Sequence, residues 1–136
     1  MTAEFLIKKE IIEESLKNET FDSAIDHRTT PLTTEALIET VWNDWSNSSK
    51  GNFWDAKNAF RESGEDSGIP SRQHSRYYES DEVARQLNDG TWVGWTYWHG
   101  GGKHGAPEAI DWIESAYFPQ VKEEIKTLTV RTFSLN

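Results

Sequence analysis

The feature that most constrains the fold is the run TWVGWTYWH at residues 91–99, where aromatic and β-branched side chains follow one another almost without interruption. Such side chains favour extended backbone, so the run predicts a β-strand. Because side chains alternate across a strand, this one has two aromatic faces. One face carries Trp92, Gly94, Thr96 and Trp98, and the other carries Val93, Trp95, Tyr97 and His99.

Two arrangements of these faces are compatible with the sequence. In the first, helices cover both faces and every ring belongs to the core, as is usual for aromatic strands. In the second, one face packs on tryptophans of the helices, and the other stays open as a slot over Gly94 between two indoles. Such a slot suits a nucleobase, a sugar or a partner's side chain. The helical tryptophans are Trp42, Trp45, Trp54 and Trp112.

A hairpin is predicted in front of this strand. Asn88-Asp89-Gly90 has the form of a three-residue loop with glycine in the left-handed position. The incoming strands are expected at residues 77–78 and 83–87, and a short helix over 80–88 is the alternative.

The residues after the strand predict a helix and a further strand. The glycine loop 100–105 precedes a predicted helix over 106–117, with Pro107 in its first turn and Pro119 after its end. Residues 127–135 are of β type and predict a final strand.

The first half of the chain predicts three helices. Residues 3–17 have a modest apolar stripe among charges, and residues 19–30 are polar and predict a loop. A second helix is expected to begin with Thr33 as its cap, with Leu32 and Leu37 as a hydrophobic staple. Its apolar face consists of Leu37, Ile38, Val41, Trp42 and Trp45.

The third helix is expected to start at Asn52 as its cap and to stop at Gly64. Residues 64–75 contain two glycines, a proline and several serines, so they predict an exposed loop and a candidate partner-binding segment.

Together these elements predict an α+β fold: three N-terminal helices, then an antiparallel sheet of three to four strands with one intervening helix. A chain of 136 residues is expected to form a single domain over 1–136, with a helical half at 1–64 and an aromatic, β-rich half at 75–136.

Composition narrows the classes of function. There are 14 Lys and Arg against 23 Asp and Glu, for a net charge of -9, and this balance works against direct binding of nucleic acid. No cysteine is present, which excludes disulfides, thiolate metal sites and a cysteine nucleophile. No long apolar run suggests a membrane span or a signal peptide, so we expect a cytoplasmic protein, in the host cytoplasm if a phage encodes it.

The glycine loop has the order of a phosphate-binding loop, because it lies between a strand and a predicted helix start. In such loops glycines let backbone amides approach an anion and a lysine supplies charge. Gly101, Gly102 and Lys103 occupy the corresponding places, although the spacing of a nucleotide-binding motif is absent. The other interpretation is a turn between two elements.

His99 and His104 lie five residues apart around this loop. Two imidazoles with a carboxylate can hold a metal, and one imidazole can act as a general base. A flexible five-residue spacing fixes no coordination geometry, so solvent-facing polar residues are the other interpretation, and we expect no metal and no cofactor.

Acidic side chains are concentrated in the first half of the chain. Such an array can compete for a basic, nucleic-acid-binding surface, or it can be an ordinary solvated helix face. Its members are Glu10, Glu13, Glu14, Glu19, Asp22, Asp26, Glu35, Glu39 and Asp44.

The block GWTYWHGGGKHGAPEAIDWIESAY resembles one found in small uncharacterised accessory proteins of bacteria and their phages. The resemblance implies a binding protein that alters a host complex, and it implies no catalytic residue.

The sequence therefore favours a small, acidic, non-enzymatic binding protein. Its expected partner is a protein, such as a host nucleic-acid-handling or defence complex, and the acidic surface suits a basic one. A homodimer is also compatible. The alternative is a binder of a nucleotide or another small anion, or an enzyme acting on one, that uses the loop 100–105. The expected binding residues are Trp92, Trp95, Trp98, His99, Gly101, Gly102, Lys103 and His104.

Overall fold

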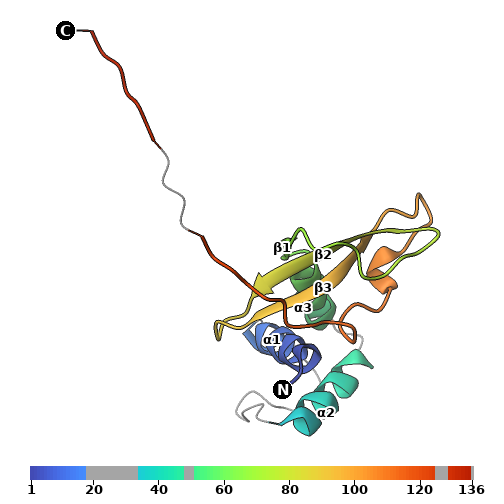
Figure 1. Cartoon of the computed structure of the whole chain (residues 1–136). Helices are drawn as coiled ribbons and strands as arrows, with labels where there is room; N and C mark the ends of the chain where they lie inside the picture. The colour runs from blue at the N-terminus through green and yellow to red at the C-terminus, as the bar shows by residue number, and fades with distance from the viewer. Residues whose placement is uncertain (18–33, 48–50, 125–128, 136) are drawn as a thin grey trace.

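The described part of the chain combines three helices with one antiparallel sheet, which confirms the α+β class (Figure 1). The computed structural model describes residues 1–17, 34–47, 51–124 and 129–135. The predicted loop at 19–30 lies outside these residues. Along the described chain, no helix has both the length and the apolar character needed to cross a membrane.

The helices are α1 (Ala3–Lys17), α2 (Glu35–Ser46) and α3 (Gly51–Arg61). Thr34 is the cap of α2, because its hydroxyl accepts a hydrogen bond from the Leu37 amide at 3.2 Å. The prediction of Thr33 as this cap was therefore wrong by one residue, and the staple residue Leu32 lies outside the described residues. The prediction of Asn52 as the cap of α3 was wrong, since this helix already begins at Gly51.

The sheet has the order β1-β2-β3, with β1 at Glu65–Asp66, β2 at Glu79–Gln86 and β3 at Trp92–His99. Both pairings are antiparallel. The helix alternative for 80–88 was wrong, and the two short strands expected at 77–78 and 83–87 are replaced by β2. The loop predicted over 64–75 contains β1, which pairs with the second half of β2.

The predicted hairpin loop is confirmed. The Leu87 amide donates to the Thr91 carbonyl at 2.7 Å, and Gly90 adopts a φ of 92°, which glycine tolerates best. This loop sets the register of β2 on β3, in which Val83 lies opposite Trp95.

The prediction of a helix over 106–117 was wrong. Only Pro107–Ala109 form a single 3₁₀ turn, and extended backbone follows at Ile110. Beyond it, the consecutive residues Trp112 and Ile113 are both buried, and Tyr117 pairs with β3. This pairing requires extended backbone, which a continued helix does not supply.

The core lies between the helices and one face of the sheet. Figure 1 shows α1 and α3 beneath the β2–β3 hairpin, and α1 contacts α2, α3 and β3. Rings of Phe60, Trp95 and Trp112 pack together with centroids 5.2–6.0 Å apart. Trp54, which the sequence placed in the core, is 42 % exposed.

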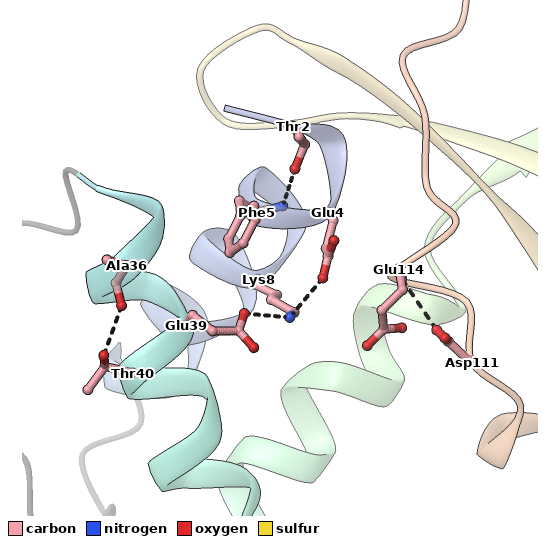
Figure 2. Close-up of polar contacts among 9 residues, drawn as sticks. All are labelled: Thr2, Glu4, Phe5, Lys8, Ala36, Glu39, Thr40, Asp111 and Glu114. Carbon is pink, nitrogen blue, oxygen red and sulfur yellow. Dashed lines mark hydrogen bonds and ion pairs between the residues drawn. The ribbon is translucent and has the colours of Figure 1, made fainter.

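Two charged side chains are buried where α1 meets its neighbours. The Lys8 ammonium lies between carboxylates of Glu4 on α1 and Glu39 on α2, at 3.0 and 2.8 Å (Figure 2). Glu10 contacts the Arg85 guanidinium at 3.1 Å and accepts a hydrogen bond from the Asn88 amide at 2.7 Å. Because buried charges are costly unless paired, these contacts fix α1 against α2 and the hairpin.

Residues 129–135 form no strand, contrary to the strand predicted over 127–135, and residues 127–128 lie outside the described chain.

Candidate binding surfaces

The open slot predicted over Gly94 is filled by Tyr117. A Cβ atom on Gly94 would lie only 2.8 Å from the Tyr117 ring, so the ring rests directly on the glycine backbone. The two backbones form an antiparallel bridge, with the Gly94 amide 2.8 Å from the Tyr117 carbonyl and the Tyr117 amide 3.0 Å from the Gly94 carbonyl. Of the two arrangements compatible with the sequence, the open slot was therefore wrong, and the ring that covers Gly94 comes from an extended segment and not from a helix, as the other arrangement required.

A buried carboxylate lies beside the ring. Glu82 on β2 is 1 % exposed and lies opposite Thr96 in the sheet. Its carboxylate accepts hydrogen bonds from the Thr96 hydroxyl at 2.8 Å, the Tyr117 hydroxyl at 2.9 Å and the Arg72 amide at 3.3 Å. These three donors replace the water that the carboxylate loses on burial.

The environment of Tyr117 favours its neutral form. Burial, followed by the hydrogen bond to Glu82 and the charge of Glu82, raises the pKa of Tyr117 to about 12. The guanidinium carbon of Arg72 lies 4.1 Å from the centre of the Tyr117 ring, in cation–π contact. We call this arrangement the Gly94 slot: the backbone of Gly94, the carboxylate of Glu82 and the guanidinium of Arg72, with the Tyr117 ring among them.

The three tryptophans of β3 differ in accessibility. Trp95 is fully buried on the helix-facing side, Trp98 is buried on the side of Gly94, and Trp92 is half-buried. The carbonyl of Trp98 accepts a hydrogen bond from Arg61 of α3. Trp95 therefore lies in the core, and Trp92 is the strand indole with the most access to solvent.

The glycine loop is shaped by packing. Gly100, Gly101 and Gly102 have φ values of 81°, 85° and 72°, a conformation that favours glycine. A Cβ atom on Gly101 would lie 2.4 Å from the ring of Tyr78, whose hydroxyl accepts a hydrogen bond from the Ala106 amide at 3.2 Å. Positive φ favours glycine at all three positions, and close packing against a side chain constrains Gly101 alone among them.

Lys103 and His104 are exposed on this loop and make no polar contact with other described residues. His99 points elsewhere, with its Nε2 2.8 Å from a carboxylate oxygen of Asp81 and its Nδ1 3.5 Å from one of Glu79. Over the described part of the chain, no three His, Asp or Glu side chains gather as metal ligands.

The acidic array is only partly a free surface. Glu10 and Glu39 are held by Arg85 and Lys8, and Glu14 contacts Lys17 at 2.9 Å. Burial is the main cause that raises the pKa of Glu13. Glu19, Asp22 and Asp26 lie outside the described residues.

An open pocket that the sequence did not predict lies beside Lys57. It has a volume of about 280 Å³ and is lined by Trp42, Lys57 and residues 108–114. The ammonium lies 5.0 Å from the ring centre of Trp54 and 5.8 Å from that of Trp42. Burial lowers the pKa of Lys57, the charge of Asp111 opposes this shift, and Asp111 also accepts a hydrogen bond from the Glu114 amide (Figure 2).

Among the described residues, the most exposed large apolar side chains lie in residues 129–135, which we call the C-terminal segment. Val130, Phe133 and Leu135 are 82 %, 90 % and 101 % exposed, and the segment lies away from the helices and sheet (Figure 1).

Comparison of the chain with protein-family models, with curated proteins and with solved structures gives no match.

Proposed function

We propose that this protein is a non-enzymatic binding protein that attaches to a protein partner through its C-terminal segment. The observation that carries the proposal is the near-complete exposure of Val130, Phe133 and Leu135. Exposed apolar side chains grouped on one segment are characteristic of interaction sites, because leaving them in water is unfavourable.

Addition of a β-strand is the binding mode that suits this segment. Its sequence, TVRTFSL, contains β-branched and aromatic residues and neither glycine nor proline. A segment of this kind can pair with the open edge of a partner's sheet, where main-chain hydrogen bonds give affinity and alternate side chains give specificity. Burying one large apolar side chain contributes about 1.5–3 kcal/mol, so these residues can supply much of the affinity.

The resemblance of residues 94–117 suggests the source of the partner. It supports a phage-type accessory protein that modulates or inhibits a host complex, and the acidic composition favours a basic partner. For the alternative, an anionic ligand at the loop 100–105, the contacts of the described residues add no support.

Site-directed photo-crosslinking tests the proposal. A photoreactive phenylalanine analogue replaces Phe133 in one preparation and Tyr77, an aromatic residue that is 74 % exposed, in a matched control. In lysate of the native host, we expect the Phe133 position alone to give one discrete adduct, which unlabelled protein suppresses by competition.

A second variant separates binding from folding. Phe133→Asp should abolish the competition and leave the midpoint of thermal unfolding unchanged, because the side chain contributes nothing to the core. Equal adducts from both positions, or full competition by Phe133→Asp, would overturn the proposal.

A further inference from the structure

The Gly94 slot has the features of a recognition site, although a residue of the chain itself fills it. Packing alone would be satisfied by an apolar side chain in the place of Glu82, whereas a carboxylate with 1 % exposure requires hydrogen-bond donors. The hydroxyl of Tyr117 is one of three such donors. The slot therefore selects a ring that carries a hydroxyl group.

We propose that the Gly94 slot binds a tyrosine on an extended segment of a partner protein, and that Tyr117 occupies it as an internal competitor until the partner displaces it. The inference rests on contacts of Tyr117 and is independent of the C-terminal segment.

The contacts of Tyr117 specify what such a partner must present. Its backbone must be extended, to repeat the two hydrogen bonds with Gly94 at 2.8 and 3.0 Å. Its ring must lie against the glycine, where an added Cβ atom would come within 2.8 Å of it. Its hydroxyl must donate to Glu82, and Arg72 then covers the ring. A tyrosine in a strand-like segment meets all of these conditions.

A partner that displaces Tyr117 must replace its two backbone hydrogen bonds, its hydroxyl bond to Glu82 and its contact with Arg72, but these contacts hold only one partly exposed segment. The Gly94–Tyr117 bridge is isolated and belongs to no strand. The ring is only half-buried, and Phe118, the next residue, is 50 % exposed. When a site is filled by its own chain, a partner binds only to the fraction of molecules in which the site is open. The apparent affinity for the partner is the intrinsic affinity multiplied by that fraction.

The charge of the slot also excludes a chemically related ligand. A phosphate on the tyrosine would bring a charge of about -2 to the position 2.9 Å from the Glu82 carboxylate. Like charges at that distance repel strongly in a buried site. Phosphorylated tyrosine should therefore not bind.

Peptide binding to the full chain tests the inference. The probe is a peptide of residues 113–121, IESAYFPQV, with blocked ends, measured by isothermal titration calorimetry. Tyr117→Ala, which removes the competing ring, should bind it at least tenfold more tightly than the unaltered chain does. Replacing the peptide's tyrosine with phenylalanine should weaken binding by about tenfold or more, since a hydrogen bond to a charged group is lost. The phosphorylated peptide should not bind.

Matched variants keep the outcome interpretable. In the Tyr117→Ala background, Gly94→Ala places a methyl group on the floor of the slot and should abolish binding, whereas Gly102→Ala, with no atom within 4 Å of its added Cβ, should not. If Tyr117→Ala fails to fold by circular dichroism, Tyr117→Phe replaces it. That variant keeps the ring but loses the hydroxyl, and should bind the tyrosine peptide more tightly than the unaltered chain.

Two results would overturn the inference. One is a folded variant that binds the tyrosine and phenylalanine peptides equally, or neither of them. The other is a concentration-dependent dimer of the unaltered chain that Tyr117→Ala abolishes in analytical ultracentrifugation, because a second copy would then be the occupant in place of a different protein.

Discussion

Substitution of Gly94 by alanine should destabilise the protein through one specific collision. The added Cβ would lie 2.8, 2.9 and 3.2 Å from atoms of the Tyr117 ring, whereas carbon atoms in good contact are about 3.5–4.0 Å apart. Gly94 is not among the glycines with positive φ, so its backbone accommodates alanine without strain. The cost therefore comes from moving the ring.

Residue Tyr117 is held by hydrogen bonds at its backbone and at its hydroxyl, and these bonds determine how much free energy is lost when the ring moves. Its backbone bonds to Gly94 and its hydroxyl bonds to Glu82, so moving it breaks one attachment. Overpacking costs about 1–3 kcal/mol, and a lost hydrogen bond to a charged group costs about 1.5–3 kcal/mol. The protein either tolerates the overpacking or breaks the hydrogen bond, whichever loses less free energy. We therefore expect Gly94→Ala to lower the free energy of unfolding by about 2 kcal/mol.

A double-mutant cycle isolates the collision. In the Tyr117→Ala background there is no ring to move, and alanine in place of strand glycine should stabilise by about 0.5–1 kcal/mol. The coupling energy should thus be about 2.5–3 kcal/mol, at the upper end for residues in contact.

Urea unfolding followed by tryptophan fluorescence measures each free energy, and the expected shift of midpoint for the single variant is about 1 M. An equal cost of Gly94→Ala in both backgrounds would refute the reasoning.

Three further outcomes are expected. Gly101→Ala should destabilise more than Gly102→Ala, because both have positive φ but only the first places a Cβ against another side chain, and urea unfolding of the pair checks this. The pKa of Tyr117 is about 12 in the folded state, above its ordinary value of 10.0 in the unfolded chain. The folded protein therefore keeps this contribution to its stability below pH 10 and loses it as the pH rises toward 12. Tyr117→Phe should lack this part of the alkaline decline in a series of urea titrations, and an identical decline would contradict the assignment. Nuclear magnetic resonance titration of lysine side chains should show Lys57 losing its proton at a lower pH than Lys17. Burial lowers the pKa of Lys57, whereas the hydrogen bond to Glu14 raises the pKa of Lys17. The reverse order would contradict the buried environment of Lys57.

The hairpin and its two faces were predictable because local residues determine them. A three-residue loop at Asn88-Asp89-Gly90 fixes the register, and that register places Glu82 opposite Thr96. The sequence thus contained the signal for a carboxylate on the same face as Gly94. It was missed because residues 79–82 are polar, which placed the start of the strand too late along the chain.

What the sequence did not supply is the identity of the residues that cover each face. Arg72 lies before the hairpin in the sequence and Tyr117 lies after it, and both contact the Gly94 slot. No regular spacing of residues in the sequence predicts these contacts. The same reason explains the missing helix over 106–117. Its apolar spacing suited a helix, yet the pairing of Tyr117 with Gly94 and the burial of Trp112 beside Ile113 favoured extended backbone.

The position of α1 has a consequence for synthesis of the chain on the ribosome. Ile7, Ile11 and Ile12 belong to the core that also contains Val93 and Trp95 of β3, and Glu10 pairs with Arg85 and Asn88. The segment translated early therefore has no complete surface to bury against until the hairpin has left the exit tunnel. The helices α2 and α3, which also pack on α1, are made first, but the roughly 80 residues between these isoleucines and β3 take about 4–16 s to synthesise at 5–20 residues per second, and the core stays incomplete for that time. During that interval a nascent chain of this protein is a natural substrate for ribosome-associated chaperones.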